Sequence, residues 1–504
     1  MQDGLYIMAK IDNIKGEPFA RLSAEEEKSY IGEIFYKQQY YSTLIDLTGA
    51  SVSRFILGQR GQGKTATILH MMEDMKAKGV LPILVDRYDG FPMQGNKNYF
   101  LYMMVQKLTF KIALRLMENR RLHKNLTKNQ QEQLSFFIEA FYEPECAEEC
   151  IATAKIIEDK KRRNKIKKFI NDHLSFLNNL IGVVVKVGAE LIKSHAGLDA
   201  DISSVGGDFI QGFEIESFNG LSREDIVAWD SSKLVKVLKS LTGIAISCNY
   251  NSIAFLFDKI DELSAIHSDI NKVNSFIIDM LTDTELLYSD HISIVVSLWS
   301  EVKKSLNKSG VRFDKFKEVD LRWRNTELIE LMNKRLFYFS INKVRPVTFE
   351  SLVPESSERN KIMELADGSP RSFISLMGYI LAEEESGKGL ITSFSADALS
   401  KGYLMFCKKF DYISAQPSRT GKGNDLQTWI TRLLRLKLTQ FTLVQYCTFF
   451  NIKQKTGSNH VDTLIKYNLI KDTMLPMDDG AILYEVVDPR IRHLISRGVL
   501  DLDR

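Results

Sequence analysis

The pattern of apolar and polar positions predicts an α/β fold whose sheet is interrupted by a long helical stretch. Short apolar runs of β type lie at 54–57, 80–85, 252–257 and 291–298. Apolar residues at helical spacing follow at 66–78, 99–116, 271–283, 325–336 and 372–384. The succession of strand, Gly-rich turn, helix and strand between 54 and 85 is typical of a parallel sheet.

The two ends of the chain show different patterns. Residues 1–50 are expected to be mostly helical, because a helical pattern begins at Ala24 and continues to Leu47. Near the other end, the polar stretch 416–424 contains Gly and Pro and indicates a linker. Three helices at 426–436, 439–450 and 458–467 then precede two strands at 469–475 and 481–487, which are separated by the turn signal Asp478-Asp-Gly480. Three helices followed by a hairpin predict a winged helix.

These patterns divide the chain, whose 504 residues are enough for roughly three domains. We expect an N-terminal helical segment at 1–50 and a sheet-containing core at 51–120 and 246–345. A helical insertion is expected at 121–245, a helical lid at 346–415 and a winged-helix domain at 416–504.

Composition limits the classes of partner. The 67 basic and 64 acidic residues nearly balance, which does not indicate a general nucleic-acid binder, and any basic surface is expected to be local. Five cysteines are an odd number spread over a long chain, which argues against a disulfide scaffold and for a cytoplasmic location. The most apolar run, 180–192, contains Lys186 and Glu190 and is too short to span a bilayer, so no membrane partner is expected.

The strongest chemical signal is the motif Gly58-x-x-x-x-Gly63-Lys64-Thr65. Such glycines let backbone amides turn toward a polyphosphate, and the N-terminus of the following helix adds partial positive charge. Lys64 is predicted to reach the β- and γ-phosphates, and the Thr65 hydroxyl to bind Mg²⁺. The predicted ATP-contacting residues are Gly58, Gln59, Arg60, Gly61, Gln62, Gly63, Lys64, Thr65 and Ala66. The alternative is an ordinary Gly-rich turn.

A second signal is the acidic sequence that follows the strand at 252–257. Asp258 stands directly after this strand, and Asp261 and Glu262 follow it. An acid at the carboxyl end of a buried parallel strand lies beside the phosphate loop in folds of this class. Asp258 is therefore predicted to hold Mg²⁺, and Asp261 or Glu262 to polarise the attacking water. The alternative is a set of solvated acids at a strand exit.

Together these motifs resemble the P-loop ATPases of the STAND and Orc/Cdc6-like AAA+ group. The resemblance rests on Gly58 to Thr65 and on Asp258-Lys-Ile-Asp261-Glu262, and it extends to Gly368-Ser-Pro-Arg371 at the start of a helix. It implies an ATPase with ATP and Mg²⁺ as ligands, a lid whose Arg371 senses nucleotide, and homo-oligomers in which Arg312 reaches a neighbour's γ-phosphate. For Arg371 a surface position at a helix start, and for Arg312 a simple salt bridge, are the alternatives.

The chain departs from this family at two places. Lys259 follows Asp258 where a small residue is usual, and the strand that ends Ser297-Leu-Trp299-Ser300 has no Asn or Arg at its tip. Both departures predict slow hydrolysis, with ATP acting mainly as a switch.

Two biological roles remain open. The first, by family analogy, is a bacterial signalling or antiviral-defence ATPase that assembles with nucleotide and works with a separate effector protein. The second is a DNA-transaction ATPase (an initiator, loader or transposition regulator) that binds duplex DNA through its winged helix. The basic run Lys160-Lys-Arg-Arg-Asn-Lys-Ile-Lys-Lys168 is a further possible nucleic-acid contact, or a solvated helix face.

Overall fold

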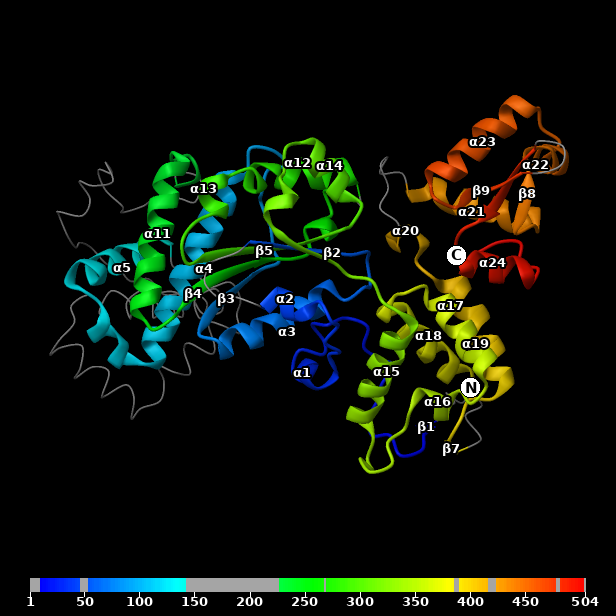
Figure 1. Ribbon diagram of the computed structural model, residues 1–504, viewed down its shortest axis with the longest axis horizontal. Helices are drawn as coiled ribbons and strands as arrows, with labels where there is room; N and C mark the ends of the chain where they lie inside the picture. The colour runs from blue at the N-terminus through cyan, green and yellow to red at the C-terminus, as the bar shows by residue number, and fades with distance from the viewer. Residues whose placement is uncertain are drawn as a thin grey trace, which may run out of the picture.

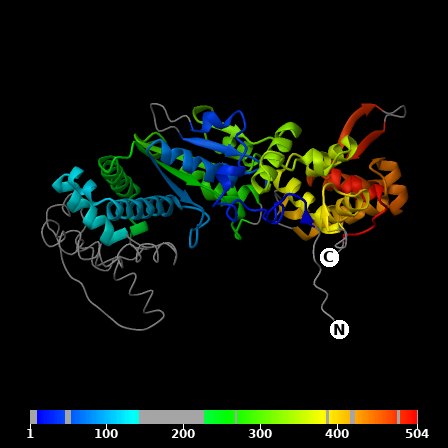
Figure 2. The ribbon, with the colours of Figure 1, turned by 90° about the horizontal axis from the view of Figure 1, so that it is seen from below.

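A computed structural model shows an elongated molecule with a sheet at one end and a second helical body at the other (Figures 1 and 2). The structure describes residues 10–45, 53–141, 226–266, 269–384, 389–415, 423–476 and 481–502. The basic run 160–168, the apolar run 180–192, the turn at 478–480 and most of the expected linker lie outside these residues. In the described part of the chain, no helix is both long enough and apolar enough to cross a bilayer.

The central feature is a five-stranded parallel sheet with the strand order β3-β4-β5-β2-β6. Its strands are β2 (Arg54–Leu57), β3 (Val80–Val85), β4 (Ser252–Phe257), β5 (Ile292–Leu298) and β6 (Lys317–Asp320). The α/β fold predicted from the sequence, with a parallel sheet, is confirmed. The sequence pattern missed β6, because its residues Lys-Glu-Val-Asp contain one apolar side chain and form the sheet edge.

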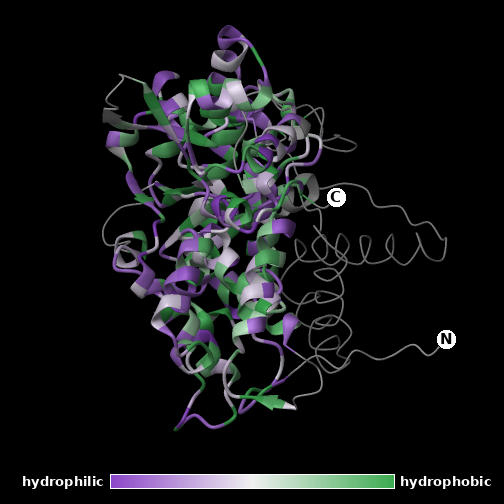
Figure 3. Ribbon diagram, turned by 90° about the vertical axis from the view of Figure 1, so that its right-hand side faces the viewer, coloured by the Kyte–Doolittle hydropathy of each residue, from purple (hydrophilic) through white to green (hydrophobic). Residues whose placement is uncertain are grey.

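Both faces of the sheet are covered. Successive side chains of a strand point to opposite faces, and each face packs in its own apolar core. Phe55 and Phe257 belong to the larger core, with α4 (Lys97–Glu118), α11 (Ser231–Ser247) and α12 (Ile270–Leu281). Ile56 and Leu256 point to the opposite face, against α3 (Lys64–Ala77). Figure 3 shows hydrophobic (green) and hydrophilic (purple) residues together on single helices of the molecule, as expected for helices with one buried side.

The described ends of the expected insertion are part of the larger core. Helix η1 (Arg120–Asn125) and α5 (Lys128–Phe141) follow α4, and α11 packs against both α4 and α5. Phe137 and Leu238, for example, lie in the same apolar cluster as the strand residue Phe255. The shorter elements of this body are η2 (Ile260–Glu262), α13 (Thr284–Leu287), α14 (Val302–Lys308) and η3 (Phe313–Lys315).

The described part of the N-terminal segment, 10–45, is much less helical than its pattern predicts. Its described part contains only β1 (Lys10–Ile11), α1 (Ile31–Ile34) and α2 (Tyr41–Ile45), and the rest is turn and extended chain. Tertiary contacts explain the difference, because this segment lies between the sheet and the second body. Arg335 accounts for much of this placement, since it pairs with Glu27 and donates to the carbonyl of Pro18.

The second body begins with the lid helices, and these start earlier than the expected boundary at 346, because Leu328, Met332 and Leu336 lie in the same apolar cluster as the rest of the lid. These are α15 (Asn325–Phe339), α16 (Phe349–Leu352), α17 (Ser356–Ala366), α18 (Pro370–Glu383), α19 (Ala396–Lys409) and α20 (Tyr412–Ala415). Strand β7 (Leu390–Ile391) pairs in parallel with β1, which attaches the N-terminal segment to this body. Helices α18 and α19 cross closely at Gly402, where an added Cβ would lie 2.7 Å from the Cα of Ile380.

We call residues 423–502 the C-terminal unit. Its elements are α21 (Gly423–Leu436), β8 (Gln440–Thr442), α22 (Leu443–Phe450), α23 (Gln454–Lys466), β9 (Ile470–Pro476), β10 (Ile482–Val486) and α24 (Pro489–Ser496). The strands form an antiparallel sheet in the order β8-β10-β9. The predicted helix at 439–450 begins as β8, because Phe441 pairs with Tyr484 in the sheet. Helix α23 begins four residues earlier than the pattern suggested, and α24 was not predicted.

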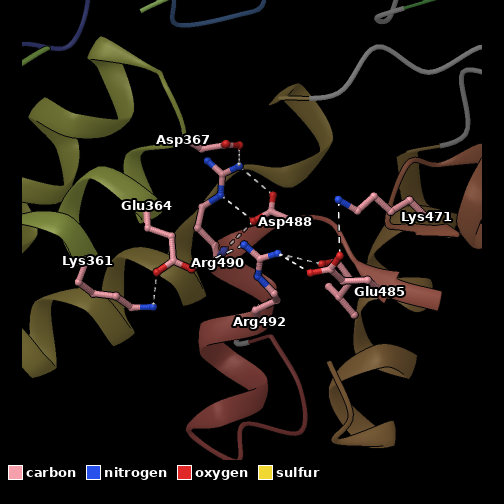
Figure 4. Close-up of polar contacts among 9 residues, drawn as sticks. Lys361, Glu364, Asp367, Lys471, Glu485, Asp488, Arg490 and Arg492 are labelled. Carbon is pink, nitrogen blue, oxygen red and sulfur yellow. Dashed lines mark hydrogen bonds and ion pairs between the residues drawn. The ribbon is translucent and has the colours of Figure 1, made fainter. Parts of the chain in front are cut away.

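Figure 4 shows how the C-terminal unit is held on the lid. The Arg490 guanidinium donates twice to Asp488, reaches Asp367 of the lid at 3.1 Å and lies 3.9 Å from the ring centre of Phe410. Nearby, Arg492 lies 3.6 Å from Glu364 of α17 and 3.4 Å from Glu485 of β10. Lid and C-terminal unit also share one apolar core, which includes Leu376 and Leu494.

Candidate functional site

The turn between β2 and α3 has a conformation that requires glycine. Gly61 and Gly63 have φ angles of +83° and +89°, in the left-handed region that side chains with a Cβ rarely adopt. A Cβ on Gly61 would also lie 2.7 Å from the Ser369 hydroxyl oxygen. The turn is followed at once by the first residue of α3, Lys64, so the free amides of a helix N-terminus adjoin it.

Lys64 is held in the middle of this turn. Its side chain is buried, and its Nζ donates to the carbonyls of Gly58 at 3.0 Å and Gln59 at 3.3 Å. The Asp261 carboxylate lies 3.5 Å from the same nitrogen. Two carbonyls and one carboxylate therefore keep a buried cation directly below the turn.

Thr65 and Asp258 meet at the carboxyl edge of the sheet. The Thr65 hydroxyl donates to one Asp258 oxygen at 2.7 Å, and the Ser297 hydroxyl donates to the other. Burial raises the pKa of the Asp258 carboxyl above its ordinary value, and the nearby Asp261 carboxylate adds to this increase. The two hydroxyls and Lys64 counteract it. Such a carboxylate gains stability from a cation placed beside it.

The contact of Ser297 with Asp258 was not predicted from the sequence. Ser297 belongs to β5, which lies between β2 and β4 in the sheet and so brings Ser297 next to Asp258. The strand position was predicted, but the strand order, which makes the two residues neighbours, was not. A serine near the carboxyl end of a buried strand is the signal that could have indicated it.

The acidic residues after Asp258 are placed differently from one another. Asp261 is buried beside Lys64, whereas Glu262 is exposed at the wall of the adjoining cavity. Lys259 has a positive φ of 60°, and its Nζ pairs with Glu25 of the N-terminal segment. The hydrogen bond and charge of Glu25 outweigh burial and raise the pKa of Lys259. A cation therefore stands at this edge of the cavity, directly after Asp258.

A cavity adjoins the turn and is closed by three parts of the chain. Its lining from the turn and sheet edge is Arg60, Gly61, Gly63, Lys64, Thr65, Ala66, Asp258, Lys259, Asp261 and Glu262. The lid contributes Leu331, Arg335, Pro370, Arg371 and Ile374, and Trp323 lies just before α15. The N-terminal segment adds Arg21, Leu22, Ser23, Ala24, Glu27, Ile31, Ile34, Phe35 and Tyr36. This last wall was not predicted, because no motif or spacing marks its residues in the sequence.

The two arginines named by the resemblance differ in position. Arg371 lines the cavity, its backbone N–H donates to the Gly61 carbonyl at 3.3 Å, and its side chain donates to the Leu22 carbonyl. Arg312 is not among the lining residues of this cavity. Its guanidinium is exposed and makes two hydrogen bonds of 2.9 and 2.8 Å to Asp314.

The residues at the turn fit a magnesium–triphosphate group. The turn tolerates no Cβ at Gly61, the lysine is buried with its nitrogen near three oxygen atoms, and a hydroxyl and a carboxylate lie together. Hydroxyl and carboxylate oxygens are ligands that Mg²⁺ accepts alongside water and phosphate oxygens. Bound ATP–Mg²⁺ would supply a divalent charge beside Asp258 and a transferable phosphoryl group.

Comparisons with known proteins give distant structural similarity. No protein-family model matches the chain, and no curated protein matches it. The structure is similar to that of the ORC2 protein of Aeropyrum pernix in ADPNP and ADP complexes, with a TM-score of 0.40 and 11% identity over 99% of this chain and 96% of that one. It is also similar to the Aeropyrum pernix ORC1 protein in complex with DNA, with a TM-score of 0.33 and 11% identity over 95% of this chain and 94% of that one.

Proposed function

We propose that the protein binds ATP–Mg²⁺ between its sheet and its lid and acts as a nucleotide-dependent switch. The observation that carries this proposal is the 2.7 Å hydrogen bond from Thr65 to Asp258, beside a turn that positions a buried lysine. Thr65 and Asp258 would hold the metal, and the amides of 61–65 with Lys64 would hold the phosphates. Arg371 would contact the nucleotide from the lid.

We propose that hydrolysis occurs and is slow. The Asp261 carboxylate is paired with Lys64. Glu262 is exposed at the cavity wall and is therefore the better placed of the two acids to orient water. The charge of Lys259 is paired with Glu25 and Asp86, and a cationic side chain at this edge of the cavity does not activate water. Phosphate release should therefore fall in Glu262→Gln and be affected less in a conservative Lys259→Arg variant.

Calorimetry with ATP and Mg²⁺ tests the nucleotide site. Lys64→Ala should abolish tight binding, because it removes the buried cation that faces the phosphates. Lys76→Ala is the matched control, since Lys76 belongs to the same helix but is exposed and pairs with Glu73. Equal ATP affinity in both variants would exclude this site.

The switching part of the proposal rests on the turn at 367–371. On one side, Ser369 and the Arg371 amide donate to the Gly61 carbonyl of the phosphate loop. On the other side, Asp367 pairs with Arg490 of the C-terminal unit. Closure of the lid on nucleotide would therefore move the C-terminal unit through the five consecutive residues 367–371.

Homo-oligomers are the second part of this switch. Because Arg312 is exposed and outside the cavity of its own chain, any contact with a γ-phosphate would be to a neighbour's nucleotide. Mass measurement with and without ATP should show larger assemblies with ATP, and Arg312→Ala should reduce them. Asp314→Ala is the control, because it removes the intrachain partner and leaves the arginine.

Duplex DNA binding is the second candidate function, and one surface favours it. The exposed residues of α23 and its N-cap include Lys453, Lys455 and Lys466, with Asp462 as the acid among them. His460 points inward against Trp429 and Tyr446, and burial lowers its pKa, so it does not add to this charge at neutral pH. An exposed helix with polar and basic residues suits a major groove.

A salt series distinguishes the two biological roles. If the C-terminal unit binds DNA, retention of duplex DNA should fall steeply with salt, and the double variant Lys455→Ala with Lys466→Ala should flatten that slope by about two phosphate contacts. Lys304→Ala with Lys308→Ala, in α14, is the control for loss of charge. No retention at low salt would leave the signalling role, in which an effector protein is the partner.

A further inference from the structure

The carbonyl groups of the phosphate loop are held by donors from several parts of the chain. Lys64 bonds those of Gly58 and Gln59, and Thr67 bonds that of Gly63 from within α3. The Gly61 carbonyl accepts from Ser369 and from the Arg371 amide of the lid. The Gln62 carbonyl accepts from the indole Nε1–H of Trp323 at 3.0 Å.

Trp323 is brought to the loop by the edge of the sheet. Strand β6 pairs with β2, and the pairing continues as Leu321 N–H donates to the Leu57 carbonyl at 2.7 Å. The chain therefore runs alongside the phosphate loop for the next two residues and then enters α15 of the lid. The indole also packs near Gly63, where an added Cβ would lie 4.0 Å from a Trp323 ring carbon.

The hydrogen bond from Trp323 fixes the orientation of one peptide group. In a trans peptide the carbonyl and the following N–H point in opposite directions. Holding the Gln62 carbonyl toward Trp323 therefore turns the Gly63 N–H away from the indole. Gly63 lines the cavity directly before Lys64, where a phosphate-binding amide is needed. With φ near +89°, this glycine has no side chain to restrict rotation of the peptide, so an outside donor is useful.

We propose that Trp323 is a positioning residue for phosphate binding. By holding the Gln62 carbonyl it aims the Gly63 amide at the phosphate chain, and because it lies two residues before the start of α15 it makes phosphate affinity depend on the position of the lid. This inference rests on the proposed function of the site. It assigns to Trp323 a role in orienting the loop, not in contacting the base.

Two ligands separate this role from a contact with the nucleoside. Titrations compare ATP with inorganic tripolyphosphate, both with Mg²⁺, on the full-length protein and on Trp323→Phe. Loss of one hydrogen bond should weaken both ligands by the same factor, about three- to tenfold. Trp429→Phe in the C-terminal unit is the control for loss of an indole, and should bind both ligands like the wild type.

Other results of these titrations would contradict either the role of Trp323 or the nucleotide site itself. Unchanged affinity for both ligands, or weaker ATP with unchanged tripolyphosphate, would overturn the proposal. If the wild type bound neither ligand, the proposed nucleotide site itself would fail. Should Trp323→Phe be unstable in a thermal melt, the same titrations apply to a protein carrying benzothienylalanine at position 323, in which sulfur replaces the indole N–H and the ring shape is kept.

Discussion

The guanidinium of Arg490 lies 3.1 Å from the carboxylate of Asp367, although 123 residues separate them in the chain. Asp367 ends α17 with a φ of +52° and begins the turn that contacts the phosphate loop. Arg490 is buried, and the adjacent Asp488 accepts two hydrogen bonds from it. One buried cation thus joins the C-terminal unit to the residues nearest the candidate nucleotide site.

Arg490→Met should destabilise the protein by about 3–5 kcal/mol, because it leaves buried Asp488 without its counter-charge. Urea unfolding followed by circular dichroism measures this change. Lys361→Ala should change the free energy of unfolding by less than about 1 kcal/mol, because the Lys361–Glu364 pair in Figure 4 is partly exposed. Equal effects of the two substitutions would contradict the role given to Arg490.

Asp367→Asn tests how nucleotide binding is coupled to the C-terminal unit more than it tests the stability of the protein. The Asp367 side chain is half exposed, so loss of its charge should cost little unfolding free energy. The expected effect is a smaller ATP-induced change in hydrogen exchange of α24, since the turn and Arg490 are then joined more weakly. An undiminished change in α24 would show that the C-terminal unit is coupled to nucleotide by another route.

Thr65→Ala should remove most of the dependence of ATP affinity on Mg²⁺. The hydroxyl donates to Asp258 and is the expected metal ligand, and a hydrogen bond to a charged group is worth enough to change affinity by about tenfold. Calorimetry with and without Mg²⁺ gives the ratio of affinities. Thr65→Ser keeps the hydroxyl and should keep the ratio near that of the wild type.

Gly61→Ala should weaken ATP binding and disturb the docking of the lid. The added Cβ would meet the Ser369 hydroxyl at 2.7 Å, and φ of +83° disfavours alanine. Gly95→Ala is a useful control, because Gly95 also has a positive φ but nothing lies within 4 Å of its Cβ position. Both substitutions strain the backbone, but only Gly61 lies in the turn of the candidate site. Only Gly61→Ala should therefore reduce ATP affinity.

Acid should destabilise the junction of α24 and the lid through His493. Burial, followed by the charges of Lys361 and Arg497, lowers the pKa of His493 to about 4. The unfolded chain takes up this proton near the ordinary pKa of 6.5, before the folded chain does, so stability is lost as pH falls from about 6.5 toward 4. The loss should be on the order of 3 kcal/mol. In His493→Gln, urea titrations at several pH values should show a smaller loss over this interval.

The sequence was a good guide wherever function or packing restricts each residue locally. The glycine-rich turn between β2 and α3, strand β4 with Asp258 after it, and helix α18 with Arg371 lie where their motifs and apolar runs placed them. Four of the five sheet strands were visible because they are buried on both faces and therefore nearly all apolar. These features depend on neighbours in the chain, which a pattern can show.

Other features depend on contacts that no local pattern records. The N-terminal segment has helix-forming residues, but Glu27 is paired with Arg335 and the segment becomes a cavity wall. The roles of Ser297 and Trp323 follow from strand order, which places β5 and β6 on either side of β2. Arg490, which was absent from every sequence motif, is placed by the packing of α24 on the lid.

A crystal structure of the protein soaked with a non-hydrolysable ATP analogue and Mg²⁺ would show directly where the nucleotide binds. We expect a triphosphate enclosed by the amides of 61–65, with the metal beside Thr65 and Asp258 and the side chain of Lys64 on the terminal phosphates. An analogue bound elsewhere, or no bound analogue after soaking at a saturating concentration, would contradict this expectation.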